Sequence, residues 1–98
     1  MTHKDFFFYV LDVLDREHIP YVLFAGTLLG CVREKDFLKS DTKDTDIAIS
    51  DEYYWTARKV FDKEILENKC RWYGIKRKEQ TVSDLNNRFK VDMFFFDK

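Results

Sequence analysis

The stretch Asp-Thr-Asp-Ile-Ala-Ile-Ser at positions 44–50 decides the fold of this chain. Its odd positions carry Thr and Ile, while its even positions carry Asp44, Asp46 and Ala48. This alternation predicts a β-strand with one apolar face and one face that presents two carboxylates. At ~3.3 Å per residue, the Cα atoms of Asp44 and Asp46 are expected about 6.6 Å apart. We therefore expect their carboxylate oxygens to converge on one cation.

A third carboxylate lies near the end of the sequence, in Lys-Val-Asp-Met-Phe at positions 90–94. Alternation places Asp92 on the face opposite Val91 and Met93. If this strand neighbours the strand at 44–50, at the usual spacing of ~4.8 Å, the three carboxylates meet at one point. Asp44, Asp46 and Asp92 are therefore the candidate metal ligands and the candidate catalytic residues.

Clustered carboxylates repel one another, and a divalent cation removes that repulsion. Ligation by oxygen alone suits Mg²⁺ or Mn²⁺, which take part of their coordination shell from substrate phosphates. The pattern thus predicts metal-assisted displacement at phosphorus, with the metal neutralising the charge that develops in the transition state. On its own, an Asp-x-Asp pair is more often a solvated strand edge or a turn.

The first half of the chain supplies a companion feature for phosphate binding. An apolar stripe at helical spacing predicts a helix over 4–18 that ends at Pro20, and the apolar run at 21–24 predicts a buried strand. Gly26 and Thr27 then open a second predicted helix, with Thr27 as its N-cap. Free backbone N–H groups at such a helix start bind anions. Positions 34–43 are charged and aperiodic, which predicts a loop.

The second half predicts one helix and two strands. Acidic residues after Ser50 start a helix that runs to about Glu67. Strands are predicted over 70–76 and 88–96, with the polar stretch 80–87 as the turn between them. The expected fold class is therefore α/β (α+β), with helices packed against one sheet, and the whole range 1–98 forms a single domain.

Composition excludes several classes of protein. Among 98 residues, Lys plus Arg total 17 and Asp plus Glu total 18, so the net charge of −1 gives no general footprint for nucleic acid. The longest apolar runs fall far short of the ~20 residues that a bilayer span requires, and no export signal is evident. Two cysteines form neither a disulfide framework nor a metal-ligand spacing, which favours reduced thiols in a cytoplasmic protein.

Taken in order, four segments carry a resemblance to a known family. They are Phe-Ala-Gly-Thr-Leu-Leu-Gly-Cys-Val-Arg at 24–33, Asp-Phe-Leu at 36–38, Lys-Asp-Thr-Asp-Ile-Ala-Ile at 43–49 and Lys-Val-Asp-Met-Phe-Phe-Phe at 90–96. This set resembles the LicD and fukutin families of the polymerase-β-like nucleotidyltransferase superfamily. The combination is specific in this order, although no single segment is.

The resemblance implies a minimal nucleotidyltransferase fold with a mixed β-sheet. It also implies a metal-dependent transferase that moves a phospho-alcohol, such as phosphocholine or ribitol phosphate, from a CDP donor to a glycan acceptor. Carried over by position, the three aspartates would hold Mg²⁺ or Mn²⁺, and Asp92 would also help to activate the acceptor hydroxyl. Gly26 and Thr27 would hold the phosphate. Arg33 would pair with a phosphate oxygen or brace the acidic cluster, and a structural ion pair with Asp36 or Glu34 is its other interpretation.

Two alternatives stay open at this level. The first is a non-catalytic or partner-dependent truncated module, which would self-associate through an exposed sheet edge at 94–96. The second is nucleotidylation of a protein or RNA target. This second activity fits less well, because 16 residues, from 28 to 43, separate Thr27 from Asp44.

Overall fold

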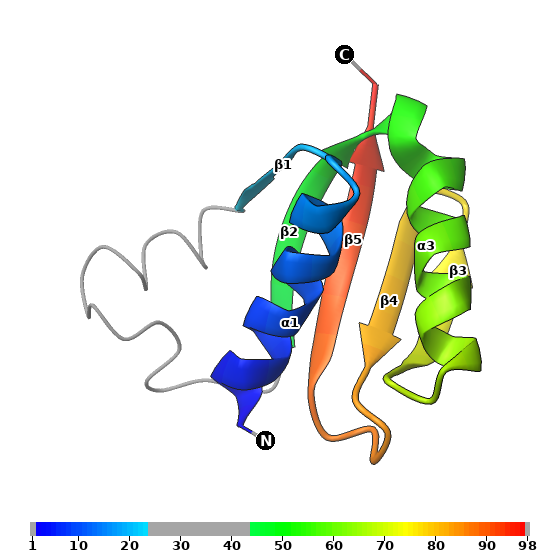
Figure 1. Cartoon of the computed structure of the whole chain (residues 1–98). Helices are drawn as coiled ribbons and strands as arrows, with labels where there is room; N and C mark the ends of the chain where they lie inside the picture. The colour runs from blue at the N-terminus through cyan, green and yellow to red at the C-terminus, as the bar shows by residue number, and fades with distance from the viewer. Residues whose placement is uncertain (1, 24–43, 98) are drawn as a thin grey trace.

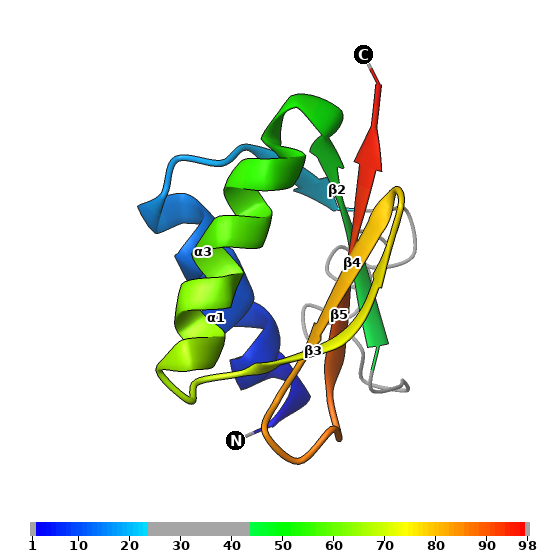
Figure 2. The same cartoon turned by 90° about the vertical axis from the view of Figure 1, so that its right-hand side faces the viewer.

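The computed structural model describes residues 2–23 and 44–97, with the side chain of Asp44 left out. Within these ranges the chain forms a five-stranded mixed sheet and two α-helices. Figures 1 and 2 show both helices on the same face of the sheet. The predicted fold class and the one-sided packing of the helices are therefore confirmed. The expected helix start at Gly26 and Thr27 and the expected loop at 34–43 lie outside the described residues.

The elements follow one another along the chain as α1 (His3–Arg16), β1 (Tyr21–Leu23), β2 (Asp44–Ser50), the 3₁₀ turn η1 (Asp51–Tyr53), α3 (Tyr54–Leu66), β3 (Arg71–Lys76), β4 (Glu79–Ser83) and β5 (Lys90–Phe96). In space the strand order is β1-β2-β5-β4-β3. The pair β2 and β5 is parallel, and the other neighbouring pairs are antiparallel. None of the helices in the described ranges has the length and apolar character that a bilayer span requires.

Both ends of α1 are defined by local hydrogen bonds. At the start, Thr2 and Asp5 form a capping box, in which each side chain accepts from the backbone N–H of the other. At the end, His18 adopts a left-handed conformation with φ 59°, and the N–H of Ile19 donates to the carbonyl oxygen of Leu14 at 2.9 Å. This is a Schellman motif, which closes the helix before Pro20 is reached. The helix predicted over 4–18 is confirmed, and it ends two residues earlier than expected, at Arg16.

The predicted turn over 80–87 is also wrong in its first half, because Glu79–Ser83 forms strand β4 between β5 and β3. The polar composition of this segment was misleading, since Gln80, Thr81 and Ser83 each form a side-chain hydrogen bond in the folded chain. Gln80 is 0% exposed, and its Nε2 donates to the carbonyl oxygen of Tyr54 at 3.2 Å. The turn itself follows, where Asp84 Oδ1 accepts from the backbone N–H groups of Arg88 and Phe89.

The expected exposed edge at 94–96 is likewise corrected. Residues 94–96 pair with 48–50 of β2, and β5 lies in the interior of the sheet. Within the described residues, the edges are β1 and β3.

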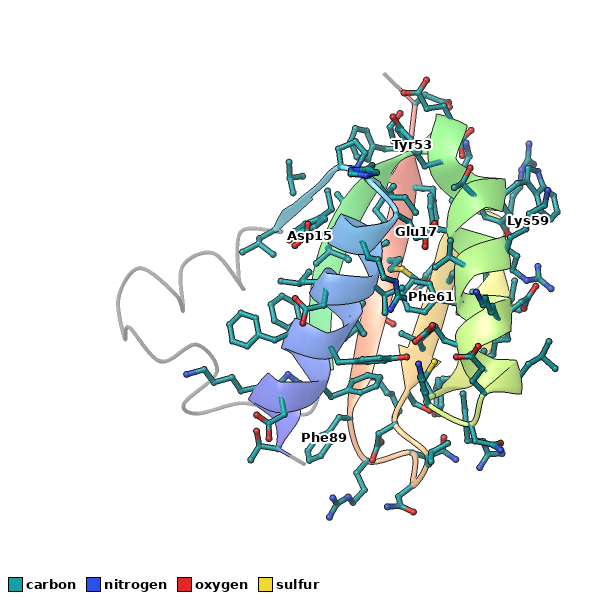
Figure 3. All side chains as sticks on the ribbon, in the orientation of Figure 1. Asp15, Glu17, Tyr53, Lys59, Phe61 and Phe89 are labelled. Atoms are coloured by element: carbon teal, nitrogen blue, oxygen red, sulfur yellow. The ribbon has the colours of Figure 1, made fainter. Side chains whose placement is uncertain are left out.

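The core lies between the two helices and the sheet. In Figure 3, Phe61 points from α3 into this layer, and it is completely buried. On the side of α3 that faces the sheet, Ala57 and Phe61 are fully covered, while Tyr54, Val60 and Ile65 are partly buried against the core. Residues from every α-helix and from strands β2, β4 and β5 contribute to the cluster: Phe6, Phe7, Val10, Leu11, Val13, Leu14, Ile19, Ile47, Ile49, Ala57, Phe61, Cys70, Val82, Val91, Met93 and Phe95.

A buried carboxylate joins the two helices. Glu64 of α3 is only 2% exposed, and it accepts hydrogen bonds from two groups on α1, the Tyr9 hydroxyl at 2.6 Å and the Arg16 guanidinium at 2.9 Å. A buried carboxylate without such partners would be strongly unfavourable. The contact therefore fixes how α1 and α3 lie against each other on the sheet.

We predict that Glu64→Ala lowers the free energy of unfolding by roughly 1–3 kcal/mol, because the buried Tyr9 hydroxyl loses its acceptor. The matched control is Glu67→Ala, at the C-cap of the same helix. Glu67 is exposed and pairs only with Lys69 at the surface, so its loss should change stability by less than about 0.5 kcal/mol. Urea denaturation measures both variants. Equal effects of the two substitutions would show that the buried contact contributes little.

The stability contribution of Glu64 should also depend on pH. Burial opposes its ionisation, but the hydrogen bonds from Tyr9 and Arg16, with the charges of Arg16 and Lys69, hold the pKa of its carboxyl below the ordinary 4.5. A lowered folded-state pKa stabilises the protein above the unfolded-state pKa, and this stabilisation disappears as the pH falls through the folded-state value. The stability difference between the wild type and Glu64→Gln should therefore be largest near neutral pH and shrink below pH 4.5. A difference that stays constant into acid would contradict this assignment.

Candidate carboxylate site on the open face of the sheet

The acidic strands β2 and β5 lie next to each other in the middle of the sheet. Their parallel register pairs Asp46 directly with Asp92 and Asp44 with Lys90. The expectation that these two strands are neighbours is thus confirmed. Neighbouring strands lie about 4.8 Å apart, so Asp46 and Asp92, as register partners, have adjacent backbones.

Both aspartates belong to the sheet face that is turned away from the helices. Along β5 the burial alternates, with Val91, Met93 and Phe95 covered by the core and Asp92 only partly buried. Asp46 alternates with Thr45 and Ile47 in the same way and is also partly buried. Figure 2 shows α1 and α3 on the other side of the sheet, so the carboxylate pair lies on the face that neither described helix covers, called the open face below.

A hydroxyl from the missed strand β4 orients one of these carboxylates. Thr81 is the register partner of Asp92 on its other side, and its Oγ1 donates to Asp92 Oδ1 at 2.5 Å. Gly74 of β3 pairs with Thr81 in turn. One row across four strands therefore reads Asp46, Asp92, Thr81 and Gly74.

Two of the four residues in this row are acidic. Like charges placed directly opposite each other on neighbouring strands destabilise a sheet. Asp46 and Asp92 occupy such a position in the register. The hydroxyl of Thr81 is neutral, so it fixes the direction of the Asp92 carboxylate without cancelling its charge. Oxygen donors of this kind fit Mg²⁺ or Mn²⁺.

A pocket of about 310 Å³ lies beside the pair, on the side of β4 and β3. Asp92, Thr81 and Lys90 are among the residues that line it. The Nζ of Lys90 lies 4.1 Å from the centre of the Tyr73 ring, a cation–π contact that holds both side chains at the pocket wall.

The remaining predicted site residues cannot be placed in this arrangement. Gly26, Thr27 and Arg33 lie outside the described residues, as does the side chain of Asp44, although the backbone of Asp44 is part of β2. Among the side chains that the structure describes, no three His, Cys, Asp or Glu groups gather into a metal-binding cluster. The gathering of three carboxylates around one ion therefore stays a prediction.

Reasoning from the sequence missed Thr81 and Lys90 as site residues. Lys90 belongs to the quoted segment at 90–96, and its distance of two residues from Asp92 would have placed it on the same face. Thr81 carried a weaker signal, because residues 80–83 are mostly polar and show no apolar–polar alternation that would indicate a strand. Its partner in the sheet is set by a long-range pairing that no local pattern shows.

Comparison with known families agrees with this geometry. The family model described as LicD/FKTN/FKRP, nucleotidyltransferase domain, matches residues 18–98, a range that contains β2, β5 and β4. Comparison with curated protein sequences gives no match. Since the family model covers most of the chain, the protein belongs to the LicD/FKTN/FKRP nucleotidyltransferase-domain family.

Proposed function

We propose that this domain is a metal-dependent transferase that moves a phospho-alcohol, such as phosphocholine or ribitol phosphate, from a CDP donor to a hydroxyl of a glycan. The single observation that supports it best is the register of β2 and β5, which sets Asp46 directly opposite Asp92 on the open face. The membership of the family supports the transferase class.

In this proposal Asp44, Asp46 and Asp92 hold Mg²⁺ or Mn²⁺. The ion, when bound, orients the donor phosphates and offsets the negative charge that grows at phosphorus. Gly26, Thr27 and Arg33 retain the phosphate-binding roles that the resemblance implies.

Asp92 has a second role in the proposal, as the group that receives the proton of the acceptor hydroxyl. Its Oδ1 already accepts the Thr81 hydroxyl, so we assign the incoming proton to Oδ2. Thr81 acts as a positioning residue, because its hydrogen bond limits the rotation of the carboxylate. A carboxylate held in one orientation loses less entropy when it binds an ion or takes up a proton.

The metal-binding step gives the first test of this proposal. We expect Asp46→Asn and Asp92→Asn each to weaken Mn²⁺ binding by more than about tenfold, because each removes a charged ligand from the same ion. Isothermal titration calorimetry with MnCl₂ measures this, and release of CMP from CDP-choline or CDP-ribitol in the presence of a glycan measures turnover.

The matched control is Asp12→Asn, which removes an exposed carboxylate on α1, across the sheet from the site. It should bind Mn²⁺ like the wild type. Equal binding by the wild type and both site variants, or no binding by the wild type, would reject the proposed function.

The role of Thr81 gives a separate prediction. Thr81→Val removes the hydroxyl at nearly constant volume, and we expect it to weaken Mn²⁺ binding by roughly 10–100-fold, the usual cost of losing a group that orients a metal ligand. Thr81→Ser retains the hydroxyl and should restore most of the affinity. If Thr81→Ser were as defective as Thr81→Val, the effect would come from packing in β4 and not from the hydrogen bond.

A further inference from the structure

The pocket beside Asp92 has a floor and two walls that follow from the strand register. Thr81 and Gly74 lie at adjacent register positions under it. A methyl group added at Gly74 would meet nothing within 4 Å, which shows that the space above this residue is open. On either side of the row that Thr81 and Asp92 form, the pocket is lined by Lys90 and by Glu79, each two residues away along its strand.

This pocket opens onto only one end of the carboxylate pair. It is lined by Asp92, whereas Asp46 lies on β2, one strand further from β3. Asp92 is the group to which the proposed function assigns the proton of the acceptor hydroxyl, so the pocket adjoins the carboxylate at which the second substrate would react.

The lining favours a neutral molecule with many hydroxyl groups over a second phosphate. Two cations, Lys76 and Lys90, are matched by two carboxylates, Glu79 and Asp92, so the formal charges of the lining cancel. Ammonium groups only donate hydrogen bonds and carboxylates only accept them, while a sugar hydroxyl does both. Tyr73 adds a ring that is 56% exposed, an apolar surface with a polar end.

We propose that this pocket binds the saccharide acceptor, with Tyr73 and Glu79 as specificity-determining residues and with Asp92 facing the reacting hydroxyl. The proposal rests on the proposed function and adds the place and the residues at which the acceptor is recognised. At about 310 Å³ the pocket lies at the small end of the range of roughly 300–1,000 Å³ for small-molecule sites, which suits a saccharide of one or two units.

The step that follows is balanced in atoms and electrons. The acceptor hydroxyl transfers its proton to the Asp92 carboxylate, and its oxygen forms a new bond to the phosphorus that carries the alcohol. The anhydride bond between this phosphorus and CMP breaks, and CMP leaves with the electron pair. The products are the phosphodiester-linked glycan and CMP, and the proton returns to solvent from Asp92.

The test uses the ¹⁵N-labelled chain in heteronuclear NMR, titrated with methyl β-D-galactopyranoside and with methyl β-D-glucopyranoside, in the absence of metal. We expect the amide signals of Gly74, Thr81 and Lys90 to shift with at least one glycoside. Absence of shifts up to the solubility limit of both glycosides would overturn the proposal. It would equally be overturned if inorganic pyrophosphate moved these signals and the glycosides did not.

Gly74→Val is the sharpest variant, because Gly74 lines the pocket and a Cβ added there meets nothing within 4 Å. It should weaken glycoside binding by roughly tenfold or more, while the midpoint of urea unfolding stays close to that of the wild type. Tyr73→Ala should have a similar effect. The matched control is Trp55→Ala, which removes an aromatic side chain that is 66% exposed on α3, and it should bind the glycosides unchanged.

Failure of this proposal is distinguishable from failure of the proposed function. If the wild type binds Mn²⁺ but the glycosides leave the pocket signals unmoved, the acceptor site is rejected and the metal-dependent function stands. If the glycosides bind at the pocket but Mn²⁺ does not bind, the metal-dependent function is rejected and the saccharide site stands.

Discussion

The parallel pairing of β2 with β5 is the constraint on which the rest of this structure depends. It pairs Asp46 with Asp92, two residues that are 46 positions apart in the sequence. The same pairing positions residues of the core and residues of the candidate site. The same register that buries Ile47 and Met93 under the helices sets the two aspartates on the opposite face. A slip of one residue would exchange the faces, burying carboxylates and exposing aliphatic side chains. The large cost of that exchange is what ties the position of the candidate site to the stability of the fold.

The sequence allowed β2 and β5 to be predicted because both segments carry their information locally. Each segment alternates between apolar and polar residues, and this alternation is typical of a β-strand with one buried face. Strand β4 lacked this signal, since Gln80, Thr81 and Ser83 are polar on both faces. Their burial is favourable only because partners arrive from elsewhere, such as the Tyr54 carbonyl for Gln80 and the Asp92 carboxylate for Thr81. The end of α1 was misjudged for a related reason, because the left-handed conformation of His18 closes the helix before Pro20 has any effect.

The candidate site could also be predicted only where its residues lie in segments with a clear local pattern. The pairing of Asp46 and Asp92 follows from two local patterns and the assumption that their strands are neighbours, an assumption that the structure confirms. The hydroxyl that orients Asp92 and the pocket next to it depend on the order of β5, β4 and β3, which no local pattern contains. Residues such as Tyr73 and Gly74 therefore carry no site signal in the sequence and become relevant only through the topology.

The protein handles its buried and half-buried carboxylates in two different ways. Glu64 receives both a hydroxyl and a guanidinium from α1, so its charge is offset by the protein itself and the group serves packing. Asp92 receives a hydroxyl from Thr81, which fixes its orientation, a second carboxylate lies opposite it, and Lys90 lines the same pocket two residues away along β5. A sheet gains nothing in stability from such an arrangement. We therefore place the proposed chemistry at this carboxylate pair, and not at the junction of the helices, where Tyr9 and Arg16 already bind Glu64.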